Sequence, residues 1–137
     1  IAGIKLGKTH PGSAFFEFQQ EIVNYYNRGV IIALCSKNNE DDVWEVFSDH
    51  PDMVIKREHI AAARINWGNK VTNLKQIAQE LNIGLDSLVF IDDSSFEVNL
   101  IKEQLPEVTV LQVPENLYEY PGFLQKNIGL FYNLSFF

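Results

Sequence analysis

The chain has 137 residues, of which 46% are hydrophobic and 21% charged, and these values fit one soluble globular domain. A formal net charge of −7 argues against a broad basic surface for nucleic acid, and no apolar run reaches the roughly 20 residues that span a bilayer. The single cysteine, Cys35, excludes an internal disulfide and a cysteine-rich zinc site, and this composition fits a cytoplasmic protein.

The first half of the chain alternates between helical and strand patterns. Apolar residues at helical spacing between positions 15 and 26 predict a first helix that stops at Gly29. The continuous apolar run 30–35 predicts a buried strand. Asn39 is placed to cap the next helix, which has three acidic residues in its first turn, and a short strand is expected at 53–55.

The second half repeats this alternation. An apolar stripe over 71–81 predicts a helix, and the runs 88–91 and 108–113 predict strands. Ser94 or Ser95 is placed to cap a helix between those two strands. Strands that alternate with helices predict an α/β fold, a Rossmann-like, doubly wound parallel sheet.

Polar residues follow the predicted strands where a ligand would bind, at the carboxyl ends of a parallel sheet. Ser36 follows the first run and Asp92-Asp93 follow the run at 88–91, while Lys70 begins the helical stripe between them. A hydroxyl beside a helix N-terminus can hold a phosphate, a lysine can offset negative charge, and carboxylates suit Mg²⁺. We therefore predict a phosphate and magnesium site on this rim.

Each residue type also has an ordinary structural explanation. A serine at a strand end is commonly a turn or cap residue, and a lysine near a helix start is commonly solvated. The adjacent carboxylates Asp92 and Asp93 are harder to explain, because they repel each other and need a compensating cation. Cys35 lies within an apolar run and is expected to be buried. Trp67 is expected to lie in the core or in a pocket wall.

The order of these residues along the chain separates two classes of phosphoryl-transfer domain. A response-regulator receiver has its acidic pair first and its lysine last. Haloacid dehalogenase folds have a nucleophilic aspartate first, then a serine or threonine, then a lysine, then an acidic pair. The chain matches the last three of these motifs and lacks the first, because it contains no Asp-x-Asp sequence.

Longer stretches resemble one branch of that superfamily more closely. The resemblance covers nearly the whole chain and is carried chiefly by Cys35-Ser36-Lys37-Asn38-Asn39, Ala62-Ala63-Arg64-Ile65-Asn66-Trp67, Lys70 and Phe90-Ile91-Asp92-Asp93. In these motifs the chain is similar to the FkbH-like branch of the haloacid dehalogenase superfamily, subfamily III type. The resemblance implies a haloacid dehalogenase core with a small cap or none.

The resemblance also implies roles for individual residues. Ser36 and Lys70 would be catalytic: Ser36 would bind the transferring phosphate, and Lys70 would stabilise both the nucleophile and the phosphate. Asp92 and Asp93 would hold Mg²⁺, and which of the two contacts the metal directly is left open.

The substrate side of the site would be formed by Ser36 together with Lys37 and Asn38. The expected partners are a small phosphorylated metabolite and an acyl carrier protein, with no nucleic acid and no membrane.

The absent first motif shapes the functional expectation. We expect residues 1–137 to be a single domain fragment truncated at both ends, with Ile1–Gly7 resembling the family's segment immediately downstream of the Asp-x-Asp motif. The fragment alone would be inactive, because it has no aspartyl nucleophile. The complete protein would be a Mg²⁺-dependent enzyme that transfers a glyceryl unit from bisphosphoglycerate to an acyl carrier protein with dephosphorylation, for polyketide or polysaccharide biosynthesis. The alternatives are a plain phosphatase of the same superfamily and a non-catalytic module that binds a partner or ligand.

Overall fold

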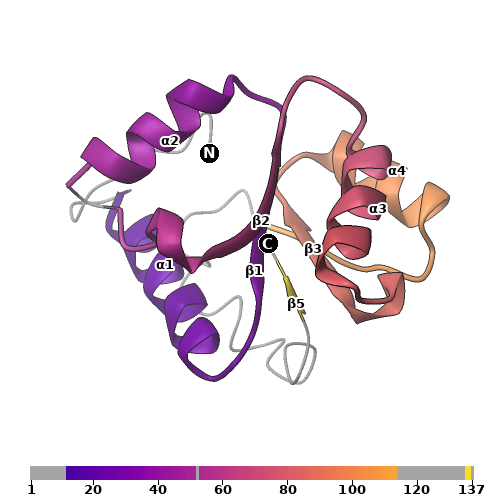
Figure 1. Cartoon of the computed structure of the whole chain (residues 1–137), viewed down its shortest axis with the longest axis horizontal. Helices are drawn as coiled ribbons and strands as arrows, with labels where there is room; N and C mark the ends of the chain where they lie inside the picture. Colours follow the sequence, from indigo (N-terminus) through magenta and orange to yellow (C-terminus); the bar gives the residue numbers. More distant parts are fainter. Residues whose placement is uncertain (1–11, 52, 114–134, 137) are drawn as a thin grey trace.

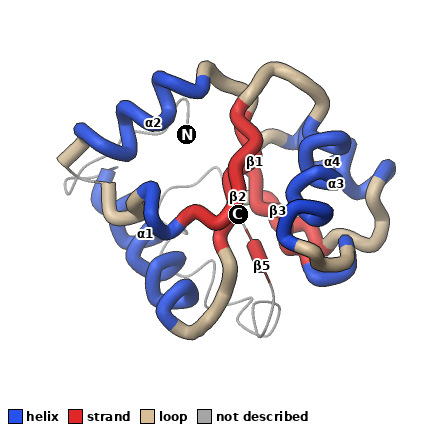
Figure 2. The backbone as a smooth tube through the Cα atoms, viewed as in Figure 1, coloured by secondary structure: helices blue, strands red, loops and turns tan. Residues whose placement is uncertain are grey.

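The computed structural model describes residues 12–51, 53–113 and 135–136. Their strands form one sheet flanked by helices, as Figures 1 and 2 show. In chain order the elements are α1 (Gly12–Asn27), β1 (Ile32–Ser36), α2 (Glu40–Asp49), the short helix η1 (Arg57–His59), β2 (Ile60–Ile65), α3 (Lys70–Leu81), η2 (Leu85–Ser87), β3 (Leu88–Asp92), α4 (Ser95–Gln104), β4 (Thr109–Gln112) and β5 (Ser135–Phe136).

The sheet has the strand order β2-β1-β5-β3-β4, and every recorded pairing is parallel. The short strand β5 lies at its centre, where Phe136 pairs with Ile32 of β1 and with Val89 of β3. Helices α1 and α2 lie on one side of the sheet and α3 and α4 on the other (Figure 1). The prediction of a doubly wound parallel sheet is therefore confirmed.

The connections place the topological switch point at the centre of this sheet. From β1 the chain passes through α2 to β2 at one edge, then returns through α3 to β3 on the other side of β5. Ligands of open α/β sheets bind outside the carboxyl ends of the strands at such a point. The residues that follow β1 and β3 are therefore the ones at which this fold would bind a ligand.

The core lies between the sheet and the helices α3 and α4. Its residues come from the inner faces of β1, β2 and β3 and from the apolar stripes of the two helices, and include Ala33, Leu74, Ile77, Leu88, Phe90 and Ile101. Burying each large side chain of this kind stabilises the fold by about 2 kcal/mol relative to leaving it exposed. The core therefore fixes the strand ends whose polar residues form the rim.

Two expectations about strands need correction. The stretch 53–55 forms no strand, because the backbone N–H groups of Val54 and Ile55 donate to the buried Gln19 side chain instead of a sheet neighbour. Strand β2 was not predicted, because between its two isoleucines the sequence Ile-Ala-Ala-Ala-Arg-Ile has only alanines and an arginine, which do not favour strands. Pairing with β1 and packing under α3 override that weak local preference.

The ends of the helices also carry information. Helix α3 ends at Asn82, which takes the left-handed conformation with φ 56°, as glycine or asparagine commonly does at that position. Asn39 precedes α2 as predicted, but its side chain makes no capping hydrogen bond. None of the described helices is long and apolar enough to cross a lipid bilayer.

Candidate functional site

The carboxyl ends of β1 and β3 bring the predicted site residues to one edge of the sheet. Ser36 is the last residue of β1 and Asp92 is the last residue of β3. Both strands run parallel to β5, which lies between them, so both end at the same edge. The Ser36 carbonyl accepts a hydrogen bond from the Asn66 N–H at 3.1 Å, which ties this strand end to the loop before α3.

A buried ion pair joins Lys70 to Asp92 on this rim. The Lys70 Nζ atom lies 2.6 Å from Asp92 Oδ2, and the two side chains are only 10% and 9% exposed. The Lys70 ammonium also lies 5.7 Å from the centre of the Phe90 ring. The second oxygen of Asp92 accepts the Ser94 N–H at 2.9 Å. Each oxygen of Asp92 thus has one partner within the protein.

Three asparagines shape the turn into α3, the helix that begins at Lys70, and the sequence analysis gave them no role in the site. The Asn69 side chain accepts the Val71 N–H at 2.6 Å and so caps α3 directly before Lys70. The Asn66 side chain accepts the N–H of Gly68 and the side-chain amide of the buried Asn73, both at 2.9 Å. An asparagine directly before an apolar helical stripe is a known capping signal, and it could have identified Asn69.

Asp93 differs from its neighbour because it is exposed to solvent. Although the residue as a whole is exposed, part of its carboxyl group is covered, and this partial burial raises the pKa of Asp93. The adjacent Asp92 raises that pKa further through a hydrogen bond and its charge. A cation at Asp93 would relieve that repulsion. In the described part of the chain, no three His, Cys, Asp or Glu side chains form a metal-binding group. The two aspartates offer the oxygen ligands that Mg²⁺ prefers, but they form only part of a metal site.

Lys37 and Asn38 follow Ser36 on the same rim. The Asn38 side chain accepts the Asn39 N–H at 2.8 Å and shapes the turn into α2. The Lys37 ammonium lies 3.0 Å from the carboxylate of Glu97, which belongs to the first turn of α4. This ion pair joins the loop after β1 to the helix after β3. Glu97 was not predicted, although the spacing from Ser94 to Glu97 is that of a capping box.

Two single-residue expectations require adjustment. Trp67 is 69% exposed and does not lie in the core, and its indole N–H donates to the Asn39 side chain at 3.0 Å. That contact uses the oxygen with which Asn39 would otherwise cap α2. Cys35 is partly buried, packed against the core, where full burial was expected.

Cys35 is expected to react slowly with alkylating reagents. Burial raises the pKa of its thiol to about 12, with Lys70 acting to lower the pKa and Asp92 and Glu97 to raise it. Because the thiolate is the reactive form, alkylation by iodoacetamide at pH 8 should be about a hundredfold slower than for free cysteine. Mass spectrometry over a time course measures this rate. The alkylation rate should rise in urea, which unfolds the chain. Equal rates in buffer and urea would show that burial in the fold does not slow the reaction of Cys35.

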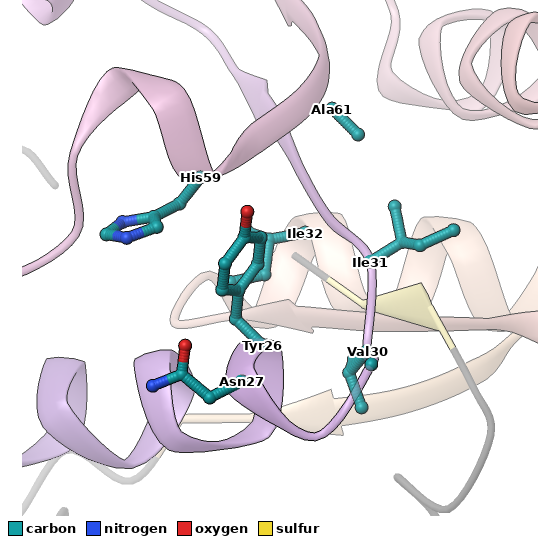
Figure 3. Close-up of a pocket in the computed structure, with 8 residues that line it drawn as sticks. Tyr26, Asn27, Val30, Ile31, Ile32, His59 and Ala61 are labelled. Carbon is teal, nitrogen blue, oxygen red and sulfur yellow. The ribbon is translucent and has the colours of Figure 1, made fainter.

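A separate pocket lies at the opposite edge of the sheet, where β1 and β2 begin. Its volume is about 440 Å³, and Figure 3 shows the ring of Tyr26 beside that of His59, with ring centres 4.8 Å apart. The pocket is lined by Tyr26, Asn27, Gly29, Val30, Ile31, Ile32, His59 and Ala61. Because β1 and β2 are parallel, this pocket is distinct from the rim that carries Ser36, Lys70 and the two aspartates.

Comparison with known proteins gives one informative similarity. No family model and no curated protein matches the chain. Among solved structures, the chain is similar to the crystal structure of the N-terminal part of the protein BF1531 from Bacteroides fragilis, described as containing a phosphatase domain complexed with Mg. The sequence identity is 46% and the TM-score is 0.80, over 90% of this chain and 32% of that chain. The chain thus spans about a third of that structure's length, and the similarity supports a phosphatase fold of the haloacid dehalogenase type.

Proposed function

We propose that the chain is part of a Mg²⁺-dependent phosphatase of the haloacid dehalogenase type, with its site on the rim between β1 and β3. The observation that carries this proposal is the buried Lys70–Asp92 pair beside Asp93 and at the same sheet edge as Ser36. The similarity to a phosphatase domain crystallised with Mg supports it. A buried lysine and an adjacent acidic pair are costly to fold unless they serve a ligand or a partner charge.

Each residue has a task in this proposal. The Ser36 hydroxyl donates to a phosphate oxygen, and Lys70 offsets negative charge between the phosphate and Asp92. Asp93 is the direct Mg²⁺ ligand, because its carboxylate is the exposed one of the pair, whereas Asp92 is buried in its ion pair with Lys70. Bound Mg²⁺ would screen the negative charge of the phosphoryl group during transfer.

The nucleophile has to come from outside the motifs of this chain. The sequence contains no Asp-x-Asp. The strand that lies between β1 and β3 in the sheet is β5, and its two residues, Ser135 and Phe136, carry no carboxylate. In this central position, among the residues that the structure describes, the two-residue strand β5 pairs with Ile32 of β1 and with Leu88 and Val89 of β3. We propose that a strand bearing Asp-x-Asp takes the place of β5 in the complete enzyme and ends beside Ser36 and Asp92.

The finer activity rests on the family resemblance. We propose that the complete enzyme takes a glyceryl unit from bisphosphoglycerate, releases phosphate and loads the unit on an acyl carrier protein. The net charge of −7 disfavours a broad encounter with an acidic carrier, so the carrier would dock on a local basic patch or on a different part of the enzyme.

The chain by itself is expected to hydrolyse no phosphate ester above background. Its residues bind and screen charge but form no covalent intermediate. The measurement is phosphate release from p-nitrophenyl phosphate with and without Mg²⁺. Clear Mg²⁺-dependent release by the purified chain would show that the site assignment is wrong.

The transferase and the plain phosphatase differ in one product. Complete enzyme, carrier protein, Mg²⁺ and bisphosphoglycerate are incubated together, and the carrier is weighed by mass spectrometry. A glyceryl adduct supports the transferase. Phosphate release with several unmodified candidate carriers favours the plain phosphatase.

A further inference from the structure

Three residues of the proposed site come from three separate elements, and contacts within the protein join these elements. Ser36 ends β1, Lys70 begins α3 and Asp92 ends β3. The ion pair between Lys70 and Asp92 joins α3 to β3. The end of β1 is joined to α3 by uncharged hydrogen bonds that run through Asn66 and Asn73.

Asn66 is the centre of that second connection. It directly follows β2, and its backbone N–H donates to the Ser36 carbonyl at 3.1 Å. Its side-chain oxygen accepts the Gly68 N–H and the side-chain amide of Asn73, each at 2.9 Å. Its own side-chain amide donates back to the Asn73 side-chain oxygen at 3.4 Å. The two side chains thus form a reciprocal amide pair, which we call the Asn66–Asn73 clasp.

The place of Asn73 on α3 connects the clasp to Lys70. Residues three apart lie on the same face of a helix, and both Lys70 and Asn73 are buried, Asn73 with only 4% of its surface exposed. Leu74, the next residue, belongs to the core. A buried amide destabilises the fold unless its hydrogen bonds are made, and an apolar side chain has no such requirement. Packing alone therefore does not call for an asparagine at this position.

The clasp fixes the start of α3 relative to the end of β1. Asn66 holds the Ser36 carbonyl with its backbone and α3 with its side chain, so a shift of the helix along its axis would break the clasp. The ion pair with Asp92 constrains the helix less, because a lysine side chain is long and flexible. Placement of this accuracy matters for a binding site, since a displacement of about 1 Å can cost about a hundredfold in activity.

We propose that Asn66 and Asn73 are positioning residues, whose clasp sets the Ser36 hydroxyl and the Lys70 ammonium at the spacing at which both contact one phosphate group. The proposal rests on the proposed function, because it takes the phosphate to be held by Ser36 and Lys70. It adds two residues that touch no substrate and act through the two that do.

The test measures the affinity of the chain for inorganic phosphate in the presence of Mg²⁺ by isothermal titration calorimetry. Ser36→Ala should weaken phosphate binding about tenfold, the effect of one hydrogen bond to a charged group. Asn73→Leu opens the clasp and should also weaken binding about tenfold, because the phosphate then contacts Ser36 or Lys70 but not both. The double variant should lose much less than the product of about a hundredfold, since the hydroxyl no longer shares the phosphate with the lysine.

The free energy of unfolding separates positioning from a structural role. Leucine has the same branching as asparagine, suits the core beside Leu74 and favours a helix more, so Asn73→Leu should leave the free energy of unfolding unchanged or higher. A loss of phosphate affinity without a loss of stability is not expected of a residue that only holds the fold together.

A second variant tests the clasp from its exposed side. Asn66→Ser should weaken phosphate binding as Asn73→Leu does, because its hydroxyl can still accept the Gly68 N–H but is too short to reach Asn73. If Asn73→Leu lowers the free energy of unfolding, Asn66→Ser decides the question. Asn99→Leu, at an exposed position of α4, is the matched control and should change phosphate affinity less than about twofold.

The failures of the two proposals are distinguishable. If phosphate binds and Ser36→Ala weakens it, but opening the clasp leaves the affinity unchanged, the present inference is overturned alone. Losses for Ser36→Ala and Asn73→Leu that multiply in the double variant would overturn it too. If phosphate does not bind, or Ser36→Ala has no effect, the phosphate site and this inference fall together.

Discussion

Replacing Lys70 by methionine is expected to lower the free energy of unfolding of the chain by about 3 kcal/mol. The substitution keeps much of the apolar stem but leaves the Asp92 carboxylate buried without its cationic partner, while the Ser94 N–H still donates to it. Removing one member of a buried ion pair typically costs about 3–5 kcal/mol, because the other charge remains uncompensated. Urea unfolding followed by circular dichroism measures the change.

Two further variants identify the cause of that loss. Lys75→Met, at an exposed position of the same helix, should change the free energy of unfolding by less than about 0.5 kcal/mol. Adding Asp92→Asn to Lys70→Met should restore part of the stability, because the uncompensated charge is then gone. Equal unfolding midpoints for the wild type and Lys70→Met would contradict the prediction, because they would show that Lys70 stabilises the fold no more than a solvated lysine does.

The second large effect concerns the metal. Asp93→Asn is expected to weaken Mg²⁺ binding about a hundredfold, which corresponds to about 3 kcal/mol, because it removes a charged oxygen ligand from the cation. Asp93 is exposed and repelled by Asp92, so the substitution should leave the fold intact. Titration calorimetry with MgCl₂ measures the affinity.

The control for this effect is Asp86→Asn. Asp86 is an exposed acid in η2, before β3 begins, and so lies away from the rim. Its substitution should leave Mg²⁺ affinity unchanged within about twofold. An equal loss in both variants would mean that the cation is held by the diffuse negative charge of the chain and not by Asp93.

The strands that sequence reasoning identified are those whose local composition agrees with their place in the sheet. The runs at 30–35, 88–91 and 108–113 are apolar because their strands are packed by neighbours in the fold, and they correspond to β1, β3 and β4. Strand β2 has an alanine-rich sequence whose strand conformation is set by the partner β1, and this information is not local. The central strand β5 pairs across nearly the whole chain, which no local pattern can indicate.

The same distinction applies to the site. Ser36, Lys70, Asp92 and Asp93 could be predicted because each stands at the end of a strand or the start of a helix, where parallel topology gathers residues. Their roles in binding remain predictions. Glu97 could not be assigned to Lys37, because its spacing from Ser94 indicates a capping box. Only the structure shows that Asp92 takes the Ser94 N–H and leaves Glu97 to pair across the rim.

A crystal structure of the chain grown with Mg²⁺ and inorganic phosphate tests the central claim most directly. The account predicts phosphate within hydrogen-bonding distance of Ser36 Oγ and Lys70 Nζ, with Mg²⁺ on the carboxylate of Asp93. Phosphate at the opposite edge of the sheet, for instance in the pocket beside Tyr26 and His59, with no ion on the rim, would contradict it.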